Sequence, residues 1–151
     1  LNAKTSSFAF GRASVIPGLL RAASHNQKLP LPLKLFEVGA VFVKESEDKI
    51  RKMKLVHQEH IIGAIYAGPT DGFAEVHGLL ERLAIKFGTD LVLKEENHKA
   101  CIKNRAAGIY LNGTRVGLVG VCSVSILKHF KIPFPITFAE INLNIVEQIV
   151  Q

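Results

Sequence analysis

Two long apolar runs on either side of a charged insert constrain the fold more than any other feature of this chain. The runs cover residues 33–44 and 57–67, and the insert between them mixes lysine and arginine with acidic residues. Runs of this length that are rich in β-branched and aromatic residues are typical of strands. Two such runs predict a long antiparallel hairpin. Its charged loop is open to three interpretations: it holds a ligand, contacts nucleic acid, or only connects the strands.

Helices are predicted on both sides of this hairpin in the sequence. Ser14 is in position to cap the first one, which tolerates Pro17 in its first turn and runs towards Asn26. In residues 73–87, apolar side chains recur on one face at the helical period, and Gly88 supplies a stop. This second segment is the clearest helix in the chain.

The C-terminal half predicts more strands. Residues 105–123 form a hairpin signal, because Asn112 and Gly113 suit the two positive φ angles of a type I′ turn. Further elements are expected at 6–10 (strand), 123–130 (helix), 136–143 (strand) and 145–150 (a helical turn or two). Strands joined by hairpins, together with these helices, predict an α+β fold in which an antiparallel β-sheet is flanked by helices on one face. Residues 1–151 are expected to form a single domain, as a fragment of a longer chain.

Charge and composition narrow the classes of function. The chain carries 19 Lys and Arg residues against 13 Asp and Glu residues, a net charge of +6. Such a balance tolerates a polyanion such as nucleic acid, although a solvated surface is the simpler explanation. Within the charged insert, the candidates for nucleic-acid contact are Lys49, Arg51, Lys52 and Lys54. No apolar run approaches the roughly 20 residues of a membrane span. The two cysteines are too few for a disulfide scaffold, which favours a cytoplasmic protein with reduced thiols.

No catalytic constellation follows from the residues alone. His57 and His60 are three residues apart on a predicted strand, so they point to opposite faces and cannot share a metal ion. The glycines of residues 113–120 lie inside a hairpin, where phosphates would meet no helix N-terminus. Relief of crowding or a β-bulge explains them better.

The chain as a whole resembles the phenylalanyl-tRNA synthetase β chain. The stretches "GRASVIPGLLRAASHN", "LPLKLFEVGAVF", "GFAEVHGLLERLAIKFG" and "GTRVGLVGVCSVSILKHFKIPFPITFAEINL" follow one another in the order found in that family. The resemblance is strongest to the archaeal and eukaryotic cytosolic form. It implies a C-terminal catalytic-like domain with the antiparallel core of class II synthetases. It also implies a heterotetramer of two α and two β chains, in which the α chain charges tRNA(Phe) and in which ATP and magnesium bind outside this domain.

The resemblance also implies a lost active site. Class II domains carry the pattern F-R-x-E, whose arginine grips the ATP α-phosphate, and here Val43 stands in place of that arginine. The closing pattern G-x-G-x-x-R falls on residues 140–145, where Glu140 and Asn142 replace the glycines and Ile145 replaces the arginine. A carboxylate would repel the triphosphate. The resemblance therefore implies a domain that is catalytically inactive on its own.

Two functions remain open at this point. In the first, the domain is structural and packs against the α chain within the tetramer. Exposed apolar residues on the first helix or on the sheet are then expected to contact partner chains. The candidate interface residues on the helix are Val15, Ile16, Leu19 and Leu20. In the second, it is a basic module that binds tRNA through the charged loop and has no role in assembly.

Overall fold

The fold is built on one antiparallel sheet. The computed structural model describes residues 12–44 and 56–150, and within them the sheet has six strands in the order β1-β2-β6-β5-β4-β3. All neighbouring strands are antiparallel. The strands are β1 (Leu33–Lys44), β2 (Val56–Ala67), β3 (Leu91–Glu95), β4 (Cys101–Leu111), β5 (Thr114–Cys122) and β6 (Ile136–Asn142).

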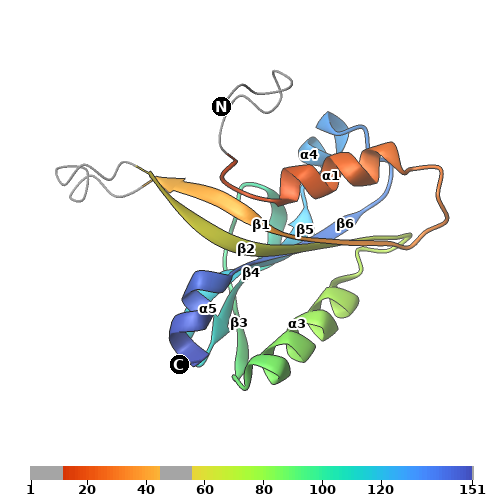
Figure 1. Cartoon of the computed structure of the whole chain (residues 1–151). Helices are drawn as coiled ribbons and strands as arrows, with labels where there is room; N and C mark the ends of the chain where they lie inside the picture. The colour runs from red at the N-terminus through yellow and green to blue at the C-terminus, as the bar shows by residue number, and fades with distance from the viewer. Residues whose placement is uncertain (1–11, 45–55, 151) are drawn as a thin grey trace.

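Helices cover both faces of this sheet. The helices of the described residues are α1 (Ile16–His25), α3 (Phe73–Phe87), α4 (Val124–His129) and α5 (Leu143–Val150). Figure 1 shows α1 and α4 above the sheet and α3 and α5 below it. The expectation that all helices lie on one face is therefore wrong. The α+β class with an antiparallel sheet is confirmed.

Two separate cores explain why both faces need helices. On the upper face, Leu19, Leu20 and Ala23 of α1 pack against strand residues that include Ile65 and Phe138. The core of the lower face is formed by one side of α3, by Val146 of α5 and by strand side chains that include Ile109 and Val119. A sheet that is apolar on both faces must bury both. The long apolar runs in the sequence are consistent with this, because a strand that is covered on both faces lacks the usual alternation of apolar and polar residues.

Local sequence signals place the elements well. Helix α3 begins after Gly72 and ends before Gly88, and both glycines have a positive φ, of 68° and 66°. Asn112 and Gly113 also have positive φ angles, as the type I′ turn between β4 and β5 requires. The long hairpin pairs Leu33 of β1 with Ala67 of β2 at its base. The predicted strand at residues 6–10 lies outside the described residues.

Strand β3 was not predicted. Its five residues pair with β4 from Leu91 with Leu111 to Glu95 with Ala107. A strand of this length gives too short an alternation to stand out beside the α3 pattern that precedes it. The sheet therefore ends in β3 at one edge and in β1 at the other.

Candidate functional site

Three of the four positions expected to mark a degenerate ATP site lie on the same sheet face. In the register, Val43 pairs with His57 on β2, while Asn142 and Glu140 on β6 pair with Ile61 and Gly63 of β2. Residues two apart on a strand share a face. Val43 and its alternate neighbours therefore face the same side as Glu140 and Asn142, which is the side covered by α1.

Glu140 holds the start of α1. Its Oε1 accepts hydrogen bonds from Ser14 Oγ and from the Val15 backbone N–H, both at 2.8 Å. Ser14 Oγ in turn accepts a hydrogen bond from the Ile16 N–H at 3.1 Å. A carboxylate beside a helix N-terminus satisfies free N–H groups and interacts favourably with the helix dipole. The groups that would attract an anion here are already bound to the protein's own carboxylate.

Val15 fills the space above β2. Its side chain is fully buried and contacts the small cluster formed with Val41 and Ile61, against which Val43 packs. A Cβ added to Gly63 would lie 2.3 Å from Val15 Cγ2. Since real Cβ atoms do not approach so closely, the helix and the strand are in direct contact at this point. This part of the upper face is therefore occupied by the chain itself.

Asn142 and Ile145 belong to the junction between β6 and α5. Asn142 Oδ1 accepts a hydrogen bond from the Ile145 N–H at 3.2 Å, and its side-chain amide donates to Glu59, which is paired with His57 at 2.8 Å. Ile145 packs against the lower core. It is therefore not brought together with Val43 and Glu140.

The helix residues expected to meet a partner are core residues of this chain. Val15 is 0% exposed, Ile16, Leu19 and Leu20 are each 7% exposed or less, and α1 turns this face onto the sheet. The expectation that they are exposed is wrong, because the same spacing that marks an interface stripe also marks a stripe packed on a sheet. The sheet itself offers exposed apolar side chains, as described below.

The other candidates from the sequence divide into two groups. Lys49, Arg51, Lys52 and Lys54 lie outside the described residues. His57 and His60 pair with Val43 and Ala40 respectively, on opposite faces of β2, as their spacing predicted. Within residues 12–44 and 56–150, no three histidine, cysteine or acidic side chains are grouped so as to hold a metal ion.

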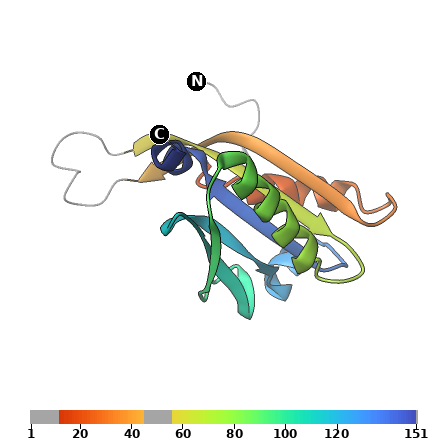
Figure 2. The same ribbon diagram turned by 90° about the horizontal axis from the view of Figure 1, so that it is seen from below.

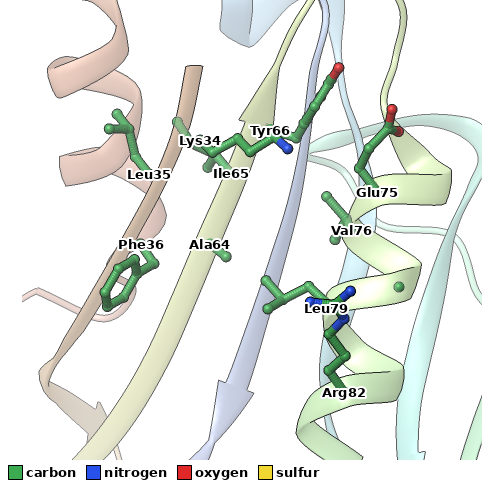
Figure 3. Close-up of a pocket in the computed structure, with 11 residues that line it drawn as sticks. Lys34, Leu35, Phe36, Ala64, Ile65, Tyr66, Glu75, Val76, Leu79 and Arg82 are labelled. Carbon is green, nitrogen blue, oxygen red and sulfur yellow. The ribbon is translucent and has the colours of Figure 1, made fainter. Parts of the chain in front are cut away.

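An open groove lies on the lower face, between the first hairpin and α3 (Figure 3). Figure 2 shows α3 along the sheet with β1 beside it and uncovered. The groove has two adjoining parts of about 540 and 270 Å³ that share Phe36, Ala64 and Leu79. Its floor and walls are mainly apolar; Lys34 and Glu75 lie at one end, and Arg82 lies further along α3, towards the other end (Figure 3). We call this the open groove; its main apolar residues are Phe36, Ile62, Ala64, Tyr66, Leu79 and Leu83.

The groove continues onto exposed apolar side chains of β1. Phe36 is 74% exposed and Val38 is 56% exposed, and Phe42 on the same face is also exposed. The sequence contained a signal for this surface. The run from residue 33 to residue 43 is apolar at even as well as odd positions, which is typical of a strand covered on both faces. In this structure only the odd-numbered face of β1 is covered.

No helix in the described part of the chain is long and apolar enough to cross a membrane.

The fold and the two sheet faces define the class of protein. It is an α+β domain whose upper sheet face is closed by its own helix and whose lower face keeps an apolar groove.

Comparison with known proteins gives the family. Residues 1–143 match the model described as the phenylalanyl tRNA synthetase beta chain CLM domain. The chain is 34% identical over 150 residues to the human phenylalanine–tRNA ligase beta subunit, an alignment that covers 95% of this chain and 25% of that protein. It is 29% identical over 160 residues to the cytoplasmic beta subunit of Arabidopsis thaliana, covering 95% of this chain and 26% of that protein. The chain belongs to the phenylalanyl-tRNA synthetase β-chain family and spans about a quarter of the length of these relatives.

Proposed function

We propose that this chain is the non-catalytic, class II synthetase-like domain of a phenylalanine–tRNA ligase β chain, with a structural role in the assembled enzyme. In this account it supports a heterotetramer of two α and two β chains in the cytoplasm. The α chain performs the ATP-dependent charging of tRNA(Phe), and ATP and magnesium bind outside this domain. The relatives support the proposal through their names, since each is the beta subunit of such a ligase.

The proposal that this domain is catalytically inactive rests on one observation, the closed upper face of the sheet. A nucleotide there would need the volume of Val15, and also the Val15 backbone N–H and the Ser14 hydroxyl that Glu140 already binds. It would also need positive charge where Val43 and Glu140 stand. Removing one contact that stabilises a transition state commonly costs about 3 kcal/mol. Here the arginine that grips the α-phosphate and the open space are absent together.

The role in assembly rests on a different surface. Phe36, Val38 and Phe42 form an exposed apolar row on β1 beside the open groove. A contiguous apolar surface of this kind, with charged residues at its margin, is typical of a protein interface. The occupant that we assign to it is the α chain, because the relatives are subunits of one ligase. Removing these apolar side chains from the surface is then expected to weaken the complex and leave the fold intact.

Co-purification of the full-length β subunit with the α subunit tests this role. The variant Phe36→Asp/Val38→Asp is expected to reduce the yield of the complex. The matched control is Ile85→Asp, because Ile85 is an equally exposed apolar residue on the far side of α3. If the α subunit is recovered equally with both variants, the groove is not part of the interface. Loss of complex with both variants would point to general damage to the fold.

ATP–pyrophosphate exchange with phenylalanine tests the other half of the proposal. The full-length β subunit without the α subunit is expected to show none, whereas the assembled ligase shows exchange. Activity of the separated β subunit, retained through repurification, would contradict the inactive reading.

A further inference from the structure

Acidic residues are distributed unevenly along this chain. All 13 lie within residues 37–96 and 140–151, so residues 1–36 and 97–139 contain no aspartate or glutamate. Both acid-free segments carry lysine and arginine. In a chain that mixes charges elsewhere, two acid-free segments concentrate positive charge wherever they meet in the fold.

The fold brings these two segments together. Ser24 Oγ of α1 donates a hydrogen bond to the Phe130 carbonyl at 2.6 Å, and Gln27 Nε2 donates to the Lys131 carbonyl at 2.7 Å. At the other end of α4, the Ser123 N–H donates to the Ala100 carbonyl at 2.8 Å. The end of α1, helix α4 and the turn before β4 therefore lie side by side, and Figure 1 shows α1 and α4 adjacent on the upper side of the sheet.

Four exposed lysines project from this region. They are Lys28, Lys99, Lys128 and Lys131, which we call the basic strip. In the described part of the chain none of them is ion-paired, whereas Arg12, Arg105 and Arg115 pair with Glu37, Asp71 and Glu96. Cations that no carboxylate neutralises attract a polyanion most strongly.

The chemistry of the strip indicates which polyanion contact it suits. A lysine ammonium is a flexible point charge that binds phosphate without fixing its geometry. Phe130, the phenyl ring of this region, is half-buried and makes a T-shaped contact with His129. Contacts of this kind bind the nucleic-acid backbone without reading its sequence.

We propose that the basic strip is a contact surface for the phosphate backbone of RNA, and that in the assembled ligase this RNA is the tRNA substrate. The choice of RNA over an acidic protein rests on the proposed function, because the relatives are named as ligases of tRNA. The strip lies on the α1 side of the sheet, opposite the open groove, so both surfaces are available at once. None of its four lysines belongs to the charged insert at residues 45–55.

The test uses the assembled ligase with full-length subunits and a tRNA(Phe) transcript. The strip variant is Lys128→Glu/Lys131→Glu, and the control is Lys86→Glu/Lys94→Glu, which makes the same change of charge on α3 and β3 at exposed positions. Binding is measured over a series of salt concentrations. Each phosphate contact contributes about 0.7 to 0.9 to the slope of log K against log salt. The strip variant is expected to lower that slope by about 1.5 and to weaken binding at low salt by about tenfold or more. The control variant is expected to change neither.

Three other results would overturn the proposal. If the strip variant keeps the affinity and slope of the wild type while the α subunit still co-purifies, the strip is not an RNA contact, and the proposed function stands. If the strip variant no longer retains the α subunit, the strip is a protein interface. If Lys49→Glu/Arg51→Glu/Lys52→Glu/Lys54→Glu lowers the slope and the strip variant does not, the loop makes the contact. Failure of the unaltered β subunit to retain the α subunit would refute the proposed function separately.

Discussion

Replacing Glu140 by alanine tests whether this carboxylate is a structural residue. Its Oε1 accepts hydrogen bonds from Ser14 Oγ and from the Val15 N–H, both at 2.8 Å. Hydrogen bonds to a charged group contribute about 1.5 to 3 kcal/mol each, and loss of a helix cap costs about 0.5 to 2 kcal/mol. Both estimates describe the same contacts, so they are not added; the range for one such bond and the range for a cap overlap between about 1.5 and 2 kcal/mol. Since Glu140 is half-buried, a value near the low end, about 2 kcal/mol, is appropriate.

Hydrogen exchange followed by mass spectrometry measures this effect locally in the intact subunit. A loss of about 2 kcal/mol raises the opening constant of the affected segment by about thirtyfold. The increase is expected in the peptide that contains Val15 and the first turn of α1, and not in α3 peptides. Glu140→Gln keeps an acceptor oxygen but loses the charge, so about 1 kcal/mol and about a fivefold increase are expected.

Glu147→Ala is the matched control, because Glu147 is exposed on α5 and its loss is expected to change stability by less than about 0.5 kcal/mol. Unchanged exchange of the α1 peptide in Glu140→Ala would refute the argument. The carboxylate would then not hold the helix, and the upper face would not be closed in the way described.

Three further predictions concern the packing of α1 on the sheet, the two buried thiols, and the proposed contact between the open groove and the α subunit. Gly63→Ala is expected to destabilise the domain by about 1 to 3 kcal/mol in a denaturant titration, because the added Cβ would lie 2.3 Å from Val15 Cγ2; an unchanged midpoint would mean that α1 is loosely seated. Burial raises the pKa of both Cys101 and Cys122 to about 11 from 9.0, so alkylation at pH 8 is expected to be far slower than in urea. Since these folded-state pKa values are raised, the stability they contribute is full below about pH 9 and is lost as pH rises towards 11; constant stability across that range would contradict the burial of the thiols. Leu79→Ala removes an exposed side chain of the open groove and is expected to weaken retention of the α subunit while changing the free energy of unfolding by less than about 0.5 kcal/mol; a large stability loss with normal assembly would assign Leu79 to the fold alone.

Local chemistry in the sequence predicted most of the fold. Gly88 marked the end of α3 because a helix commonly stops at a residue with positive φ, and Asn112–Gly113 marked a type I′ turn for a similar reason. Strand β3 was missed because five residues give little periodicity. The placement of helices on both faces was missed because it depends on the strand order β1-β2-β6-β5, which joins segments distant in the chain.

The site was predicted less completely than the fold. The sequence marked Val43 and Glu140 as residues unsuited to ATP, and the register does place them on one face with Asn142. That Glu140 caps α1 did not follow from the sequence, because Ser14 and Glu140 are 126 residues apart. Likewise, the spacing of apolar residues in α1 fixes which face is apolar but not whether that face meets the sheet or another chain.

The number of ATP sites in the assembled ligase tests the central claim most directly. Equilibrium dialysis with a non-hydrolysable ATP analogue in the presence of phenylalanine gives this number per αβ pair. Together with the proposed function, in which the α chain binds ATP, a closed upper face in the β chain predicts one bound analogue per pair and the same value for a complex carrying Val43→Arg. Two analogues per pair, with the second lost when Glu140 is altered, would show that the β-chain face binds nucleotide and would contradict the account.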